Sequence, residues 1–301
     1  MVKEQKTLDI KTVCECNRCL GSQTLHPLVS LINLESPEVE GNAVKFEFYA
    51  ILLIEECPDG CGCCGRKYYD FSNATMVFLR PDEIFRMSAT NTLPSKGWLL
   101  AFHPDLLYRT TLKNHIQNYT FFSYRKEEAL HLSQRETGKI TCCLENIEEE
   151  LHHPIDAHTG TILSRHIELM LDYCTRFYER QFITREERNK AMLAKMEHLL
   201  GEYIASGKLQ TGEMLTASSM AQQLGLSSAY FSDLLKFETG LTWNEHVQFK
   251  VLDEAKRLLL HPKNSATHVA HLLGFANVQR FSLLFKRMTG MSPNDYRFSR
   301  N

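Results

Sequence analysis

Residues 270–290 read AHLLGFANVQRFSLLFKRMTG, and residues 221–240 read AQQLGLSSAYFSDLLKFETG. Both segments place an alanine four positions before a glycine, continue through a Phe-Ser pair and end on a second glycine. The match extends past the end of each segment, since Leu241-Thr242 corresponds to Met291-Ser292. The two copies lie about fifty residues apart. A repeat of this kind predicts two copies of one supersecondary unit.

Each copy has the pattern of a short helix, a turn and a second helix. The alanine is small enough to let another helix approach, and the first glycine can adopt a positive φ in the turn. Ser227 and Asn277 stand where the second helix should begin, and their side chains can cap its free amides. The sequence therefore predicts two helix-turn-helix units, at about 218–239 and 267–289.

The second helix of each copy has an apolar face and a mostly polar face. Phe231 with Leu235, and Phe281 with Phe285, lie four positions apart and should point inward. The opposite faces carry amide, hydroxyl and charged groups, which suit base edges and phosphates in the major groove of double-stranded DNA. The predicted DNA-contacting residues are Ser228, Ala229, Ser232, Asp233 and Lys236 in the first copy, and Asn277, Gln279, Arg280, Ser282, Lys286 and Arg287 in the second.

An apolar stripe between the copies predicts one long helix. It consists of Val247, Val251, Leu252, Ala255, Leu258 and Leu259. A helix of this kind would hold the two units at a fixed distance. If both reading helices enter successive major grooves on one face of the duplex, they should sit about 34 Å apart.

Charge is distributed unevenly along the chain. The whole chain has a formal charge of −2, but residues 263–301 carry six basic side chains and one acidic one. Residues 195–262 carry six basic and eight acidic side chains. We therefore expect phosphate attraction to come mainly from the second copy.

The region 190–301 resembles the DNA-binding domain of the AraC/XylS family of bacterial transcription regulators. The resemblance is most specific near the C-terminus, in Gly274-Phe275, Phe281-Ser282, Phe285-Lys286, Gly290, Ser292-Pro293 and Tyr296-Arg297. Two positions depart from the family pattern, because Asp233 and Leu283 stand where arginine is common. An aspartate can only accept a hydrogen bond, for example from a cytosine amine, and a leucine can only touch a thymine methyl.

The resemblance implies a function and partners. It implies a sequence-specific regulator, an activator rather than a repressor, that works with RNA polymerase as a homodimer. In this family an N-terminal cupin-like barrel often senses a small molecule and dimerises. The effector, the operator and the target genes are not indicated by the sequence.

The first half of the chain alternates short β-type runs with turns, such as Glu40-Gly41-Asn42 and Pro58-Asp59-Gly60. This spacing favours a small sandwich or barrel. The runs are 28–34, 44–55, 75–79, 84–87 and 98–102, so that the β region is expected to end near His103. The predicted class is α+β, with a small cupin-like β-barrel and trailing helices followed by an all-α domain with two helix-turn-helix units.

Two helical stripes follow the β region. The first is Ile140, Leu144, Ile147 and Leu151, and the second is Leu163, Ile167, Met170, Cys174 and Phe177. The second stripe has coiled-coil spacing, so it indicates either a dimer seam or packing on the chain's own barrel. The predicted domains are 1–160 for sensing and dimerisation, 161–189 as a helical linker and 190–301 for DNA binding.

Cysteines and histidines suggest an alternative function. A zinc or thiol sensor is one alternative, based on two cysteine-rich segments: Cys14-Glu15-Cys16-Asn17-Arg18-Cys19 and the cysteines at 57, 61, 63 and 64. A metal-dependent cupin enzyme is another, based on the thirteen histidines. The cysteine spacing fits a zinc site poorly, because only Cys16 with Cys19, or Cys61 with Cys64, has the Cys-x-x-Cys form. The histidines fit a cupin metal site poorly, because no His-x-His lies inside a β run with a downstream acid. His26, His103 and His115 are isolated, and His152-His153 falls in a helical stretch.

No enzyme motif is present in the sequence. It has no Gly-x-Ser-x-Gly elbow, no phosphate-binding glycine loop and no His-Glu-x-x-His. We therefore expect no enzymatic activity, no cofactor and no metal. The longest apolar run, 50–54, is far too short to cross a membrane, and the first residues lack an export signal, so a cytoplasmic protein is expected.

Overall fold

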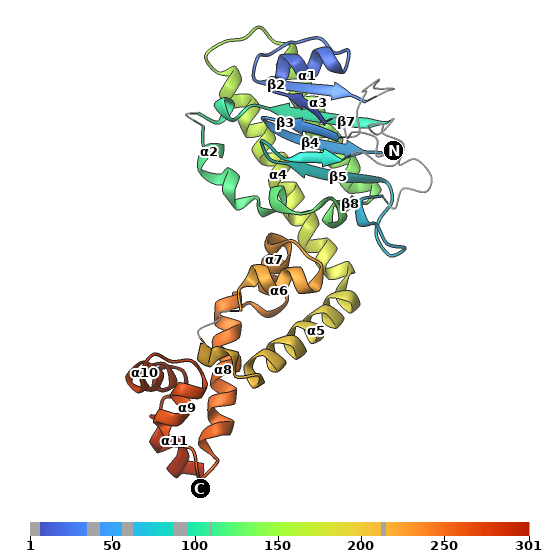
Figure 1. Cartoon of the computed structure of the whole chain (residues 1–301). Helices are drawn as coiled ribbons and strands as arrows, with labels where there is room; N and C mark the ends of the chain where they lie inside the picture. Colours follow the sequence, from blue (N-terminus) through green and yellow to red (C-terminus); the bar gives the residue numbers. More distant parts are fainter. Residues whose placement is uncertain are drawn as a thin grey trace, which may run out of the picture. The chain divides into compact units, whose positions relative to one another are not determined.

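The computed structural model describes residues 7–34, 43–55, 63–86, 96–108, 110–211 and 215–300. Contacts divide the chain into two compact units, Met1–Glu186 and Glu187–Asn301. All described strands belong to the first unit, and the described residues of the second unit form helices and turns (Figure 1). The α+β class is confirmed. No helix in the described ranges is long and apolar enough to span a membrane.

The N-terminal unit is built on two β-sheets. The larger sheet is antiparallel with strand order β2-β7-β4-β5-β8, and the smaller sheet has the order β1-β3-β6, in which β1 and β3 are parallel. The strands are β1 Thr7–Ile10, β2 Val29–Asn33, β3 Ala43–Phe46, β4 Tyr49–Ile54, β5 Ala74–Leu79, β6 Ile84–Arg86, β7 Gly97–Phe102 and β8 Leu130–Leu132.

The predicted β runs correspond to strands, with three differences. The run 44–55 is two strands, because the chain bends at Glu47-Phe48 and passes from the smaller sheet to the larger one. Strands β1 and β8 were not predicted, since four and three residues are too few to show a clear alternation. The β region therefore continues past His103. The two predicted turns quoted above lie outside the described residues.

The predicted closed cupin-like barrel is not confirmed. Among the described strands, β2 pairs only with β7 and β8 pairs only with β5, so the larger sheet has two open edges. No described ladder joins it to the smaller sheet. The strands form an open two-layer arrangement, because β3 and β4 separate into different sheets at the bend.

Both faces of the larger sheet are buried. On one face, Leu52 and Leu99 join a core that includes Phe46 and Phe85 of the smaller sheet. On the other face, the ring of Phe78 lies 4.5 Å from the ring of Phe121, measured between centroids. Burial on both faces explains why β4 is apolar throughout, with the sequence YAILLI, and does not alternate.

Helices and short turns complete this unit. The α-helices are α1 Val13–Cys19, α2 Leu112–His115, α3 Gln134–His152 and α4 Thr159–Thr184. The 3-10 turns are η1 Cys63–Gly65, η2 Pro104–Leu107, η3 Ile116–Asn118, η4 Thr120–Ser123 and η5 Lys126–Glu128. Both predicted helical stripes are present, and every residue of each is buried.

Of the two alternatives for the apolar face of residues 163–177, the structure shows packing within the chain's own N-terminal unit. This face of α4 packs inside its own unit, where the thiol of Cys174 lies 3.8 Å from the sulfur of Met76 on β5. A helix face that is already covered cannot pair with a second copy. Helix α4 is therefore part of the N-terminal unit and not a separate linker.

A buried ion pair holds the C-terminal end of α4. Arg185, which is only 2% exposed, donates two hydrogen bonds to Asp70, with Nε–Oδ1 and Nη2–Oδ2 distances of 2.8 and 2.7 Å. Burial alone would raise the pKa of the Asp70 carboxyl, but the hydrogen bonds and charge of Arg185 hold that pKa below its usual value. Loss of one partner of such a pair typically costs about 3–5 kcal/mol. The pair ties the loop before β5 to the point where α4 ends.

The C-terminal unit contains two helix-turn-helix units separated by a long helix (Figure 1). It consists of α5 Glu186–Ala205, η6 Lys208–Thr211, α6 Ala217–Leu224, α7 Ser228–Thr239, α8 Trp243–Leu259, α9 Ala266–Leu272, α10 Val278–Thr289 and α11 Pro293–Arg300. Helices α6 and α7 form the first helix-turn-helix unit, and α9 and α10 form the second. Both agree with the predicted ranges.

The predicted caps and turns are present in both units. The Ser227 hydroxyl accepts a hydrogen bond from the Tyr230 amide at the start of α7, and Asn277 Oδ1 accepts one from the Arg280 amide at the start of α10. Gly225 ends α6 with φ +73°, a conformation that glycine adopts without strain. The inward residues predicted on α7 and α10 are all buried: Phe231, Leu235, Phe281 and Phe285.

Helix α8 packs against both helix-turn-helix units. Near its start, the ring of Trp243 lies 5.6 Å from the ring of Phe231 on α7, between centroids. In its second half, Ala255 and Leu259 belong to a core that includes Phe281 and Phe285 of α10. The predicted connecting helix is therefore confirmed, and both of its ends are held by packing.

The two turn glycines differ in their surroundings, which gives a test of the fold. A Cβ at Gly274, whose φ is +74°, would lie 2.1 Å from the carbonyl oxygen of Leu209, whereas a Cβ at Gly225 would meet nothing within 4 Å. Gly225→Ala should therefore cost only the left-handed backbone penalty of about 1–2 kcal/mol. Gly274→Ala should cost at least about 2 kcal/mol more, because the Leu209 backbone must move.

Urea unfolding measures this difference. The fluorescence of Trp243 in a Trp98→Phe background reports on the C-terminal unit, because the sequence holds two tryptophans. Equal destabilisation by both alanine substitutions would contradict the close approach of Leu209 to the second turn.

Candidate nucleic-acid interface

The outer face of α10 carries most of the predicted contact residues of the second copy. Gln279, Arg280, Lys286 and Arg287 are exposed, and Ser282 is half-buried. Their side chains emerge opposite the buried phenylalanines, so the core fixes which face is presented to solvent. Asn277 is exposed as well, but its Oδ1 is used to cap the helix. The face combines an amide, a hydroxyl and three cations.

The outer face of α7 is smaller and less basic. Ser228, Ser232 and Lys236 are exposed, whereas Ala229 and Asp233 are half-buried. The hydroxyl of Ser232 donates to the backbone carbonyl of Ser228 at 2.8 Å, so its hydrogen is already used within the helix. The first copy thus offers one cation where the second offers three, which agrees with the expectation that phosphate attraction is stronger at the second.

The three cations of α10 are available for an external anion. Helix α10 contains no acidic residue, and within the described ranges no acid forms an ion pair with any of these cations. The basic residues in the last turn of α8 are instead neutralised by acids one turn earlier: Lys256 by Asp253 at 3.1 Å and Arg257 by Glu254 at 2.6 Å. A net positive, acid-free helix face suits a phosphate backbone.

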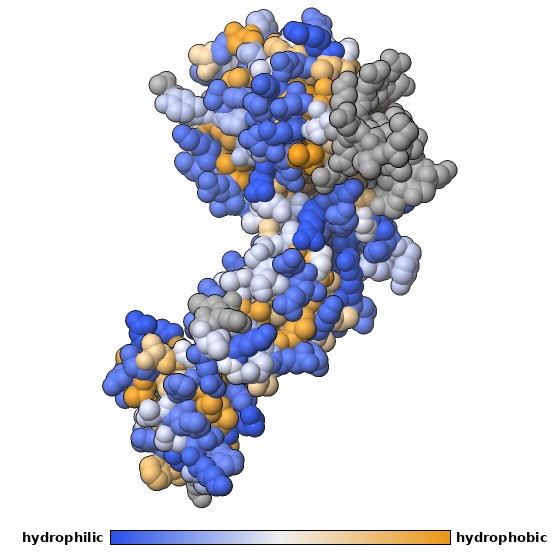
Figure 2. All heavy atoms as spheres, in the orientation of Figure 1, coloured by the Kyte–Doolittle hydropathy of each residue, from blue (hydrophilic) through white to orange (hydrophobic). Residues whose placement is uncertain are grey.

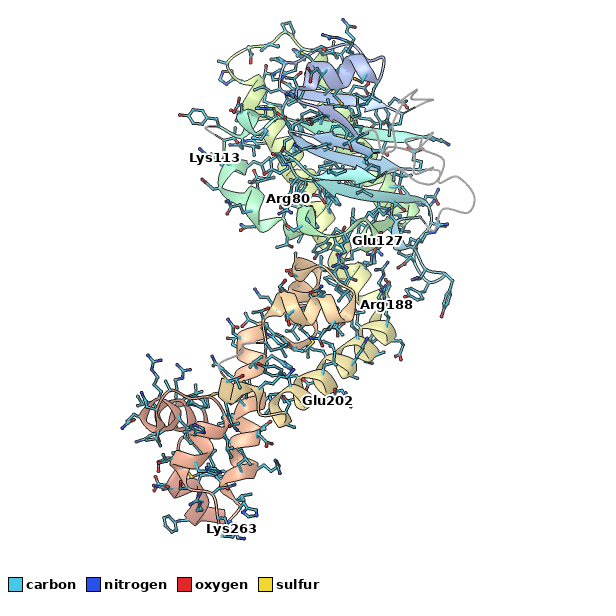
Figure 3. All side chains as sticks on the ribbon, in the orientation of Figure 1. Arg80, Lys113, Glu127, Arg188, Glu202 and Lys263 are labelled. Atoms are coloured by element: carbon cyan, nitrogen blue, oxygen red, sulfur yellow. The ribbon has the colours of Figure 1, made fainter. Side chains whose placement is uncertain are left out.

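Not all of the C-terminal basic residues belong to this face. Arg297 donates to the backbone carbonyls of Leu259, at 3.0 Å, and Asn264, and it is half-buried. Arg297 therefore satisfies backbone carbonyls at and after the end of α8, and it does not belong to the exposed basic cluster that the sequence suggested. Lys263 lies in the turn after α8 and is exposed (Figure 3). The side chain of Arg300 lies outside the described part of the structure.

One residue of the α10 face was missing from the predicted set. Leu283 is 71% exposed, although the sequence offers an apolar residue there. In the sequence this position is a departure from the family pattern that could touch only a thymine methyl, but Leu283 was not included among the predicted contacts. Figure 2 shows a largely hydrophilic visible face of the C-terminal unit with hydrophobic residues among it.

The cysteines of α1 are not gathered on one face of the helix. The helix directs Cys16 into the core, while Cys14 and Cys19 are exposed. Burial raises the pKa of the Cys16 thiol to about 12, so this thiol is not a thiolate at neutral pH. Among the described residues no group of three or more His, Cys, Asp or Glu side chains is arranged to hold a metal. Cys57 and Cys61 lie outside the described residues.

The isolated histidines of the N-terminal unit have local structural partners. His26 Nδ1 accepts from the Leu28 amide at 3.1 Å, and His103 Nδ1 accepts from the Asp105 amide at 3.2 Å. His115 Nδ1 lies 2.6 Å from a carboxylate oxygen of Glu168. Each contact stabilises a turn or joins two helices, and none brings two of these histidines together.

Comparison with known proteins agrees with this geometry. Residues 220–299 match a family model described as a helix-turn-helix domain. The C-terminal unit contains an AraC-type helix-turn-helix domain. The sequence resemblance was based on the same part of the chain, and the two helix-turn-helix units and α8 lie within or next to the matched residues.

Two curated relatives match about a third of the chain each. The chain is 33% identical over 124 residues to the uncharacterized HTH-type transcriptional regulator YobQ of Bacillus subtilis, covering 37% of this chain and 51% of the relative. It is 34% identical over 108 residues to the HTH-type transcriptional activator RhaS of Escherichia fergusonii, covering 36% of this chain and 37% of the relative. The chain thus spans about half or less of these two relatives.

Solved structures show a weak likeness. A transcriptional regulator of Chromobacterium violaceum, described by its AraC-type DNA-binding domain, is 21% identical with a TM-score of 0.33, covering 37% of this chain and 93% of that one. The DNA-binding domain of AdpA, solved with a target DNA, is 23% identical with a TM-score of 0.29, covering 37% of this chain and 90% of that one.

The α10 cations predict a specific salt effect. Lys286→Ala should reduce the slope of log affinity for DNA against log salt concentration by about one, because one phosphate contact is lost. Lys113→Ala is the charge-matched control, since Lys113 is exposed on α2 of the other unit (Figure 3). Fluorescence anisotropy of a labelled duplex at several salt concentrations measures both. An unchanged slope for Lys286→Ala would remove this residue from the phosphate contacts.

Proposed function

We propose that this protein is a sequence-specific DNA-binding transcription regulator that reads double-stranded DNA with α7 and α10. The observation that carries the proposal is the pair of capped helix-turn-helix units held by α8, with an acid-free cationic face on α10. Capping and core packing fix the orientation of each reading helix. The exposed residues then have the chemistry that base edges and phosphates require.

Each predicted contact has a role in this proposal. Arg280 has the fork of donors that suits a guanine edge, and Gln279 has the amide that suits adenine. Lys286 and Arg287, in the last turn of α10, would bind phosphates. On α7, Ser228, Ala229, Ser232, Asp233 and Lys236 would position the first unit and add modest base discrimination, while Asn277 and Ser282 would complete the second.

The N-terminal unit would control this activity. We infer that it binds a small-molecule effector, joins a second copy of the chain, or does both, and that residues 190–301 contact DNA and RNA polymerase. The relative named RhaS is an activator, which favours activation over repression for this chain. A regulator of bacterial transcription acts in the cytoplasm and needs no enzymatic step.

Selection from a random duplex library tests the proposal. Purified full-length protein is incubated with the library at two salt concentrations, and the bound sequences are read. The expected result is a motif with two half-sites about ten base pairs apart. Retention of unrelated sequences that is lost as salt rises would leave only nonspecific attraction, and no retention at either salt would contradict the proposal.

Arg280→Ala sharpens this test on the selected sequence. The substitution should weaken binding by about 1–3 kcal/mol and relax the preference at one base pair of the second half-site. Arg80→Ala, in the N-terminal unit (Figure 3), removes the same charge and should leave both affinity and sequence preference unchanged. Equal loss on all DNA sequences would make Arg280 a phosphate contact and not a base contact.

A further inference from the structure

The most unusual residue on the α10 face is Leu283. Single exposed leucines are ordinary on protein surfaces. Leu283 differs because its 71% exposed side chain lies within the face that carries the cations. The apolar residues that hold α10 to the core, Phe281 and Phe285, are both buried, so Leu283 is not needed for that packing.

Helical geometry puts Leu283 at the centre of the outer face. Side chains advance by about 100° per residue around a helix. Gln279 and Arg280 lie one turn before Leu283, and Lys286 and Arg287 lie one turn after it. Viewed along the helix axis, the side chain of Leu283 therefore points in the mean direction of these four side chains. Any molecule that binds all four must also cover Leu283.

The charge of these neighbours limits what that molecule can be. Helix α10 has three exposed cations and no acid, so its partner must be a polyanion. At the centre the partner must also offer an apolar group. In the major groove of DNA the only apolar group on a base edge is the 5-methyl of thymine.

We propose that Leu283 is a specificity-determining residue that contacts the 5-methyl group of a thymine in the second half-site. The proposal deepens the proposed function and depends on it. It predicts a thymine at the middle of the base pairs that α10 reads, flanked by positions that Gln279 and Arg280 contact. The discrimination is through an apolar contact and not through a hydrogen bond.

The first copy supplies an internal comparison. Asp233 stands at the position of α7 that matches Leu283, counted from the paired residues Phe231 and Phe281. It is half-buried and acidic, and an acid gains nothing from a methyl group. Methyl sensitivity through this helix position should therefore be confined to the second half-site.

The experiment removes the methyl group without changing base pairing. Each thymine of the sequence selected by the full-length chain is replaced in turn by deoxyuridine, and the Kd is measured for the native chain, Leu283→Ala and Leu283→Met. Alanine is a good helix former and Leu283 is exposed, so the variants should fold, and equal melting temperatures check this. Methionine keeps an apolar side chain of similar size.

One thymine in the second half-site should respond. Its replacement by deoxyuridine should weaken binding of the native chain and of Leu283→Met by about fourfold, the effect of one buried methyl group. Leu283→Ala should bind thymine and deoxyuridine at that position nearly equally. A cytosine there should weaken binding, and 5-methylcytosine should recover part of the loss.

Three results would contradict this inference, and each identifies a different part of it as wrong. If the chain selects a motif but the deoxyuridine effects are the same for the native chain and Leu283→Ala, the methyl contact is wrong and the exposed leucine serves another partner, such as a protein. If a responsive thymine lies only in the first half-site, the assignment to α10 is wrong. If no motif is selected, the proposed function fails together with this inference.

Discussion

The packing of α8 at both of its ends is the constraint on which the C-terminal unit depends. Trp243 joins the first helix-turn-helix unit to the start of α8, and Ala255 and Leu259 join the second unit to its end. A helix of 17 residues rises by roughly 25 Å, about 1.5 Å for each residue. The separation of α7 and α10 is therefore set by covalent geometry and packing, and DNA need not impose it.

The same constraint makes the difference between the two copies meaningful. The two helix-turn-helix units, called the reading heads below, are rigidly joined and bind DNA as one body. Each can therefore contribute a different share of the DNA contacts. The α10 face has three exposed cations and an amide, while the α7 face has one cation and an acid. Because affinity for duplex DNA follows the number of neutralised phosphates, the α10 face is expected to supply most of the phosphate attraction, while the proposed part of the α7 face is positioning and modest base discrimination.

Much of the C-terminal unit could be predicted from the sequence because its signals are local. The turn glycines, the caps Ser227 and Asn277, and the inward pairs on α7 and α10 are each set by residues within a few positions. The role of Arg297 could not be predicted, since it depends on carbonyls more than thirty residues away. The sequence marked Leu283 as a departure from the family pattern, and the structure adds that its side chain is 71% exposed among the cations of α10.

The N-terminal unit was less predictable because its signals are not local. Strand runs are readable one at a time, but a bend at Glu47-Phe48 sends β3 and β4 to different sheets. The apolar stripe of α4 fits a dimer seam as well as a core, and only the position of the larger sheet decides between them. The ion pair of Asp70 and Arg185 joins residues 115 positions apart, so no local sequence pattern could have predicted it.

Changing the spacing between the two half-sites tests the central claim most directly. The account predicts that inserting five base pairs, which turns the half-sites to opposite faces, and inserting ten, which restores the face but lengthens the gap, both weaken binding by at least about tenfold. The loss after ten base pairs follows from the fixed length of α8. Full affinity after either insertion would contradict a rigid connection between the two reading heads.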